Sequence, residues 1–128
     1  MNIRAGNRND LAFLQQMLFE AFFLRPDQDR PDYQEFHQDP AFHRVLAGWG
    51  RPGDRAVIAE ENESPFGAAW YRFWTEEDHS YGFVDAETPE LGIGVLADCR
   101  SRGVGRALLR ALVEAARDEG DRRALPER

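Results

Sequence analysis

The sequence contains no lysine, a single cysteine and no long hydrophobic segment, and each absence excludes something. All sixteen basic residues are arginines, and the lone Cys99 excludes an internal disulfide. The apolar runs are as short as Val57-Ile58-Ala59, whereas a membrane-spanning helix needs about 20 apolar residues. The first residues show no basic segment leading into an apolar one. We therefore expect no secretory signal and a cytoplasmic location.

The net charge of −7 is distributed unevenly along the chain. Residues 1–99 carry 8 arginines against 18 acids, which gives −10, whereas residues 100–128 carry 8 arginines against 5 acids, which gives +3. Binding to nucleic acid needs a broad basic surface, so we expect no nucleic-acid partner and no membrane partner. The basic end predicts a local site that attracts an anion. The length predicts one domain, residues 1–128.

The hydrophobic pattern predicts a mixture of strands and helices. Strands are predicted at 3–5, 55–61, 66–74 and 90–95, with a turn at 61–65. Helices are predicted from Leu11 to before Pro26, from Pro40 to Gly48 or Gly50, and from Val104 to about Glu119, with Gly120 as the stop. The predicted fold class is α/β of the α+β type, with a mostly antiparallel sheet flanked by helices.

Two features of these elements bear on binding. In strand 90–95, Gly92 and Gly94 share one face, which lets another group approach the backbone closely. Between the first two helices, residues 25–40 form a connector rich in proline and acid, in which Tyr33 and Phe36 are interleaved. This connector is either an ordinary acidic loop or one wall of a binding site.

The loop before the last helix is the segment with the clearest chemistry. Residues 100–106 read Arg-Ser-Arg-Gly-Val-Gly-Arg, the pattern R-x-x-G-x-G. Two glycines at a helix start expose backbone N–H groups where the helix carries partial positive charge, and this arrangement binds anions. Arg100, Arg102 and Arg106 add cations suited to phosphate. We predict a pyrophosphate site here; the alternatives are a tight turn and a solvated helix end.

Two other phosphate-binding motifs are excluded, each because a single required residue is absent. A dinucleotide fingerprint needs a third glycine where Leu108 stands, and a Walker loop needs the lysine that the chain lacks. The three histidines, His37, His43 and His79, share no metal-ligand spacing with Cys99, so we expect no metal. Cys99 itself is interpreted as incidental to the loop rather than as a nucleophile.

The strand end Ile93-Gly94-Val95 followed by Arg100-x-x-Gly103-x-Gly105 resembles the acyl-CoA loop of the GNAT acetyltransferase superfamily. The order of the predicted elements resembles that family too, as do segments 48–54, 67–72 and 81–85, so the resemblance covers nearly the whole chain. It implies an N-acetyltransferase that moves an acetyl group from acetyl-CoA to a primary amine.

The resemblance also implies roles for individual residues. Backbone groups of Ile93, Gly94 and Val95 would pair with the pantetheine arm. The pyrophosphate would be bound by the loop residues Arg100, Ser101, Arg102, Gly103, Val104, Gly105 and Arg106. Glu90 is the candidate general base, and a strand-end surface carboxylate is its alternative. Tyr33 and Phe36 lie where the family builds its acceptor pocket, whose acidic surroundings would favour a cationic amine.

The sequence departs from the family after the loop helix. Family members continue with a strand, a helix and two more strands, and their usual tyrosine general acid lies there. Nothing after Gly120 predicts a strand, and Ala97 stands where the family often has proline. Three interpretations stay open: a short acetyltransferase completed by a homodimer, an inactive CoA-binding relative, or a module that pairs its open sheet edge with a partner chain.

Overall fold

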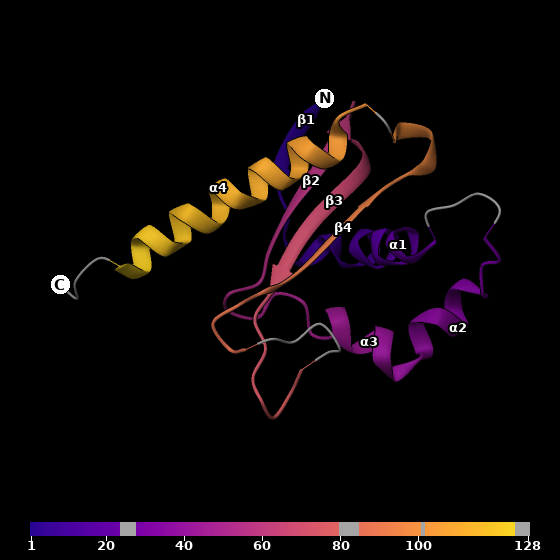
Figure 1. The fold of residues 1–128 in the computed structure, drawn as a ribbon. Coiled ribbons are helices and arrows are strands. Elements are labelled where there is room, and N and C mark those ends of the chain that lie inside the picture. The colour runs from indigo at the N-terminus through magenta and orange to yellow at the C-terminus, as the bar shows by residue number, and fades with distance from the viewer. Residues whose placement is uncertain (24–27, 80–84, 101, 125–128) are drawn as a thin grey trace.

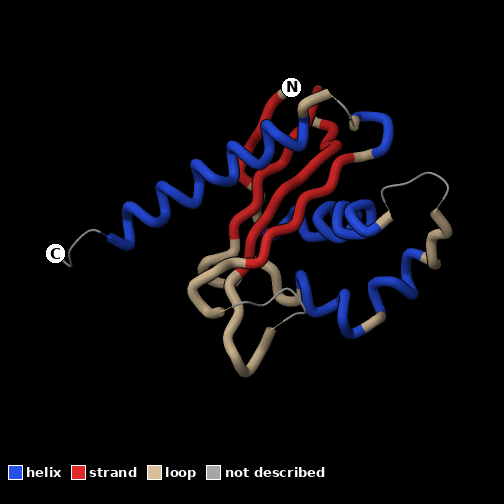
Figure 2. The backbone as a smooth tube through the Cα atoms, viewed as in Figure 1, coloured by secondary structure: helices blue, strands red, loops and turns tan. Residues whose placement is uncertain are grey.

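The computed structural model describes residues 1–23, 28–79, 85–100 and 102–124, and only the backbone of 120–124. The elements follow one another as β1 (Asn2–Ala5), η1 (Arg8–Asp10), α1 (Leu11–Phe22), α2 (Tyr33–Gln38), α3 (Pro40–Leu46), β2 (Arg55–Glu61), β3 (Ser64–Arg72), β4 (Glu90–Val95), η2 (Ala97–Cys99) and α4 (Val104–Ala124). Figure 2 shows the strands gathered in one sheet with helices around it.

The sheet has the order β1-β2-β3-β4, and each neighbouring pair is antiparallel. The predicted fold class is confirmed. Helix α4 covers one face of the sheet and α1 the other (Figure 1). Because side chains alternate along a strand, each of the central strands contributes to both layers. In β3, for example, Trp70 packs on the α1 side and Tyr71 on the α4 side.

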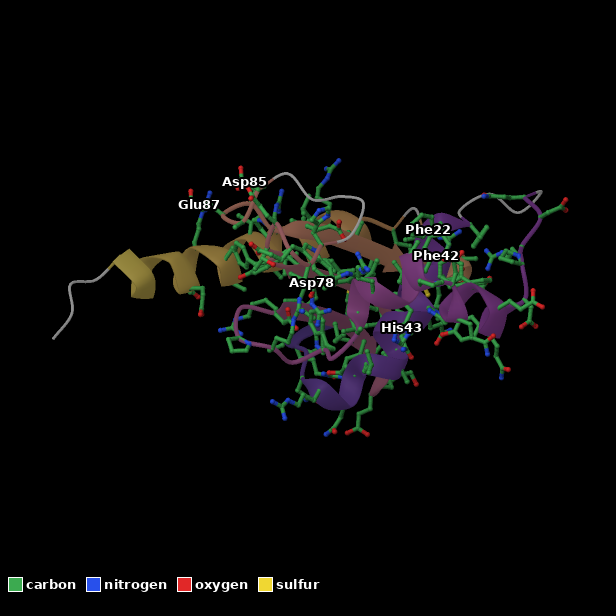
Figure 3. All side chains as sticks on the ribbon, turned by 90° about the horizontal axis from the view of Figure 1, so that it is seen from below. Phe22, Phe42, His43, Asp78, Asp85 and Glu87 are labelled. Carbon is green, nitrogen blue, oxygen red and sulfur yellow. The ribbon has the colours of Figure 1, made fainter. Side chains whose placement is uncertain are left out.

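An aromatic cluster joins α2 and α3 to α1. The Phe36 and Phe42 rings stack with centroids 4.3 Å apart, and Phe19 meets Phe36 edge-on at 5.1 Å. Phe22 reaches Phe42 at 5.0 Å, and the two rings lie together in Figure 3. Such pairs add to the stabilisation from apolar burial. The cluster fixes the short helices to the core although they have few backbone hydrogen bonds of their own.

Helix α2 lies inside the segment that the sequence analysis treats as a connector, so that part of the assignment is wrong. Asp32 caps the helix: its carboxylate accepts hydrogen bonds from the N–H groups of Gln34 and Glu35, each at 3.1 Å. Asp39 caps α3 in the same way through Ala41 N at 2.9 Å, which confirms the predicted start of that helix. Two acids of the connector therefore serve as helix caps.

Several other boundaries differ from the predicted ones, among them the end of β3, which lies at Arg72 and not at residue 74. Strand β3 begins at Ser64, two residues early, because Asn62 and Glu63 adopt positive φ values of 52° and 66° and form a tight turn. Helix α4 does not stop at Gly120 but continues to Ala124. A glycine inside a helix costs only about 1 kcal/mol relative to alanine.

A buried ion pair, which the sequence analysis missed, holds the segment before β2 against the sheet. The Arg72 guanidinium donates to both carboxylate oxygens of Asp54, at 3.0 and 2.8 Å, and to the Ala47 carbonyl at 2.7 Å. It also lies over the rings of Trp49 and Trp74, 5.3 and 5.5 Å from their centroids. The signal was present in the sequence, because strand alternation continued from β3 puts Arg72 and Trp74 on one face.

Candidate functional site: an anion-binding loop and an adjoining cleft

Strand β4 pairs with β3 on one side only among the described strands, and its other edge is open. Leu96 N donates to Phe66 O at 2.9 Å in continuation of the β3–β4 register. Hydrogen-bonded pairs alternate along an antiparallel ladder, so the peptide groups of Gly94 point toward β3 as those of Leu96 do. Those of Ile93 and Val95 point to the open edge. Of the three predicted pantetheine contacts, these two have backbone groups facing outward.

The glycines of β4 serve packing inside the protein. A Cβ added to Gly94 would lie 2.3 Å from the carbonyl oxygen of Met17 in α1. A Cβ added to Gly92 would lie 2.3 Å from ring carbons of Trp70. The close approach that these glycines allow is thus made by α1 and by a tryptophan of β3. On this face of β4 the backbone is already covered.

Arg100, at the start of the loop, is held by the protein itself. Its Nε donates to the Val95 carbonyl at 2.8 Å, and its terminal nitrogen forms an ion pair with Glu20 of α1 at 3.0 Å. Arg100 was predicted to bind phosphate directly. In the structure, these two contacts of Arg100 hold the loop against β4 and α1.

The glycines of the loop face open space at the start of α4. Gly103 has a φ of +78°, and a Cβ added there would meet nothing within 4 Å. A Cβ on Gly105 would meet only the Ile93 side chain, at 3.8 Å. The first hydrogen bond of α4 runs from Ala107 N to Gly103 O at 3.1 Å. The N–H groups of 104–106 therefore precede the helical ladder and have no acceptor within it.

Two arginines of the motif flank these glycines in the sequence. Arg102 and Arg106 are both exposed, one in the loop and one in the first turn of α4. Val104 is 4% exposed and anchors the turn in the core next to Leu108. Ser101, also predicted to contact phosphate, lies outside the described residues. Free N–H groups, a helix N-terminus and two exposed cations together form a site suited to an anion.

A cleft of about 450 Å³ opens at the other end of β4. This volume lies within the range of small-molecule sites, roughly 300–1,000 Å³. Its walls come from α1, α3, β3, β4 and the residue that precedes β4: Leu18, Ala21, Phe22, Val45, Trp70, Pro89, Glu90, Leu91, Gly92 and Ile93. Over the described residues, Glu90 is the only ionisable side chain among them. The sequence analysis did not foresee the walls from α1 and α3.

The structure places the three remaining candidates in different surroundings. Glu90 is half-buried, stands opposite Arg72 in the β3–β4 register and lines the cleft. Phe36 is 4% exposed and belongs to the aromatic cluster. Tyr33 is 40% exposed and meets Phe19 edge-on at 5.1 Å, and burial raises the pKa of its hydroxyl. Neither of these two rings is among the residues that line the cleft.

The described residues also bear on the type of site. No group of three or more histidine, cysteine, aspartate or glutamate side chains is gathered there in a way that could hold a metal ion. None of the helices in that part of the chain is both long enough and apolar enough to cross a membrane.

The sequence of residues 14–127 matches the model of the Acetyltransferase (GNAT) family. The chain therefore belongs to this family, and the resemblance stated from the loop motif is confirmed. Comparison with curated proteins finds no match.

Solved structures support the family assignment. A GCN5-related N-acetyltransferase from Ralstonia eutropha JMP134 superposes with a TM-score of 0.67 at 19% identity, over 93% of this chain and 77% of that one. A ribosomal-protein-alanine N-acetyltransferase from Brucella melitensis gives 0.59 at 25% identity, over 93% and 68%. A GNAT family acetyltransferase from Brucella melitensis, in complex with acetyl-CoA, gives 0.56 at 20% identity, over 93% and 70%.

Proposed function

We propose that this chain transfers an acetyl group from acetyl-CoA to a primary amine. The observation that carries the proposal is that one edge strand links an anion-binding loop to a cleft with a carboxylate on its wall. The loop follows the carboxyl end of β4 and Glu90 begins the strand, about 17 Å away at strand spacing. Acetyl-CoA supplies an activated thioester, and one of the similar structures contains it.

The residues at the loop fit the charged part of this donor. The N–H groups of 104–106 and the side chains of Arg102 and Arg106 would bind the pyrophosphate. The outward peptide groups of Ile93 and the N–H of Val95 would hydrogen-bond the amides of the pantetheine arm, as a neighbouring strand does, whereas the Val95 carbonyl already accepts from Arg100. Gly103 leaves the space in front of the helix open.

At the cleft, Glu90 is assigned the removal of a proton from the acceptor ammonium, either directly or through one water molecule. Only the neutral amine has the lone pair needed to attack the thioester carbonyl. The apolar walls around Glu90 reduce the contact of the amine with water and favour the uncharged nucleophile. As the C–N bond forms, the C–S bond of the thioester would break, and the departing CoA thiolate would take up the second proton lost by the amine nitrogen. The proton held by the Glu90 carboxylate would then return to solvent.

Calorimetric titration with acetyl-CoA tests the donor site. Arg102→Glu reverses a charge in the loop, and Arg110→Glu makes the same change one turn beyond the first turn of α4. We expect the loop variant to bind at least about tenfold more weakly, because a charge-assisted contact is lost and a repulsion added. Arg110→Glu should bind like the wild type.

A second titration separates phosphate recognition from general electrostatics. Acetyl-pantetheine carries the same thioester but lacks the pyrophosphate, so Arg102→Glu should not change its affinity. If Arg102→Glu lowered the affinity for both donors equally, the loop would be rejected as the phosphate site. The same conclusion would follow if Arg110→Glu lowered the acetyl-CoA affinity as much as Arg102→Glu. Release of free CoA in the presence of amines then measures transfer itself.

The open edge supports a second candidate function, pairing with another copy of the chain. Four large apolar side chains stay exposed along β4 and α4: Leu91, Ile93, Leu109 and Val113. An unpaired edge with exposed apolar residues favours strand addition. Sedimentation velocity tests this candidate, since a dimer that both Leu91→Lys and Val113→Lys abolish would support it. A monomer at all concentrations would reject it.

A further inference from the structure

We infer that the acceptor is a small monoamine with an apolar body, such as an alkyl or arylalkyl amine, rather than a polyamine or an aminoglycoside-like polycation. The inference rests on the proposed function, because it names the substrate class for the cleft beside Glu90. It comes from the composition of the cleft wall.

Among the described residues that line the cleft, one ionisable side chain, that of Glu90, can pair with an ammonium group. The described lining contains the Glu90 carboxylate and otherwise aliphatic side chains, aromatic side chains and backbone. Leu18 and Val45 on opposite helices are each 5% exposed, so the apolar surface continues into the core. A second cation on the acceptor would be desolvated against this surface without a counter-charge, which is costly. An alkyl or aryl group at the same place gains from burial.

Among the described residues of the acidic connector, none lines the cleft, so none supplies a second counter-charge there. The carboxylates of Asp32 and Asp39 accept hydrogen bonds from backbone N–H groups at the N-termini of α2 and α3. Glu20, the acid on the α1 stretch that lines the cleft, forms ion pairs with Arg30 at 2.8 Å and with Arg100 at 3.0 Å. The sequence analysis expects the acidic connector to favour a cationic amine; in the present proposal, apolar contact with the cleft wall selects among such amines.

A matched pair of acceptors tests this inference directly. Hexylamine and pentane-1,5-diamine have the same number of non-hydrogen atoms, and they differ in whether the far end is a methyl or an ammonium group. With acetyl-CoA and the full chain, we expect kcat/KM for hexylamine to exceed that for the diamine by at least about tenfold. Equal values, or a preference for the diamine, would overturn the inference.

A wall variant checks that the cleft causes the preference. Ala21→Glu places a second carboxylate on the α1 wall and keeps a good helix former, so it should lower the hexylamine-to-diamine ratio at least about tenfold. Ala12→Glu makes the same change at an exposed position of α1 outside the cleft and should leave the ratio unchanged. A ratio that Ala21→Glu does not move would assign the preference to another surface and reject the inference.

Binding separates this inference from the proposed function. Titration of both amines into the chain saturated with CoA needs no turnover. Hexylamine that binds more tightly than the diamine without being acetylated would support the cleft chemistry and reject the transferase proposal. Acetylation of amines without the expected preference would support the transferase proposal and reject the inference about the cleft. Binding of neither amine would overturn the inference.

Discussion

Glu20 and Arg100 form an ion pair at 3.0 Å between α1 and the loop that precedes α4, although they are 80 residues apart in sequence. The Glu20 side chain is 13% exposed, and it also binds Arg30 at 2.8 Å. Its helical neighbours Leu18, Ala21 and Phe22 line the cleft. The pair therefore connects the wall of the proposed acceptor cleft to the loop proposed to bind the donor.

Replacing Glu20 by glutamine should weaken acetyl-CoA binding with little effect on stability. Without the carboxylate, Arg100 loses its partner on α1 and the loop loses part of its fixed position. We expect about threefold to tenfold weaker binding by calorimetry and a loss of no more than about 1 kcal/mol in the free energy of unfolding, since partly exposed ion pairs contribute little. Arg30→Gln breaks only the other ion pair and should leave donor affinity unchanged. An equal effect of both variants would contradict the positioning role.

Glu90→Gln should remove most of the transferase activity and leave the donor site intact. A general base contributes about 100-fold or more to turnover, and glutamine keeps the shape but cannot take up the proton. We expect kcat to fall by about that factor while calorimetry shows unchanged acetyl-CoA affinity. If Glu90 is only a strand-end carboxylate, then kcat of the variant will equal that of the wild type.

Two glycine substitutions should differ in their effect on stability: one should lower it and the other should leave it unchanged. Gly94→Ala forces a Cβ against the Met17 carbonyl, and we expect a loss of about 1–3 kcal/mol in the free energy of unfolding. Gly105→Ala places its Cβ in ordinary contact with Ile93, at 3.8 Å, and should preserve both stability and donor binding. Urea denaturation of the two variants makes the comparison. Equal stability of the two would show that α1 yields easily to the added methyl.

The Arg72–Asp54 pair should respond to single and double substitution differently. Asp54→Ala leaves a buried guanidinium without its carboxylate, and we expect a loss of about 3–5 kcal/mol in the free energy of unfolding. Adding Arg72→Leu removes the unpaired charge and should restore part of that loss. A double variant less stable than the single one would show that the contacts of Arg72 with Ala47 and the tryptophans dominate.

His37 should make the protein less stable at mildly acidic pH. Desolvation lowers its pKa below the ordinary value of 6.5, and nearby His43 lowers it further. As pH falls below 6.5, the unfolded chain takes up a proton that the folded one resists, so the free energy of unfolding decreases until the folded pKa is passed. Thermal melts from neutral pH downward should show this decrease, and His37→Phe should reduce it.

A direct readout complements the melts. An NMR titration of the His37 imidazole should give a pKa below 6.5 in the wild type, and His43→Gln should move it upward by removing a neighbouring positive charge. An imidazole that titrates at or above 6.5 in the folded protein would contradict the expected acid sensitivity.

Local sequence patterns predicted elements that are each formed by one continuous segment of the chain. Strands 55–61 and 90–95 and the start of α3 at Pro40 were predicted with the bounds that the structure shows. Helix α2 was missed because six residues give too short a pattern, and its stability depends on aromatic contacts with α1.

The loop could be predicted from the sequence and the cleft could not, because the loop is one continuous segment and the cleft is formed by several separate elements. The loop is one continuous segment, so its glycines and arginines could be found from their spacing alone. The cleft requires α1, α3 and β4 to pack together, and no sequence pattern describes that packing. Arg100 shows the limit within the loop itself, because its partner Glu20 lies 80 residues earlier.

The two glycines of β4 have a consequence for how the sheet assembles. A shift of β4 by one residue would press the side chain of Leu91, Ile93 or Val95 against the Met17 backbone and the Trp70 ring, where there is space for a hydrogen atom. The same shift would turn Glu90 out of the cleft and exchange the peptide groups that face the open edge. The glycines thus favour the observed alignment of the strand, in which Glu90 lines the cleft and the peptide groups of Ile93 face the open edge.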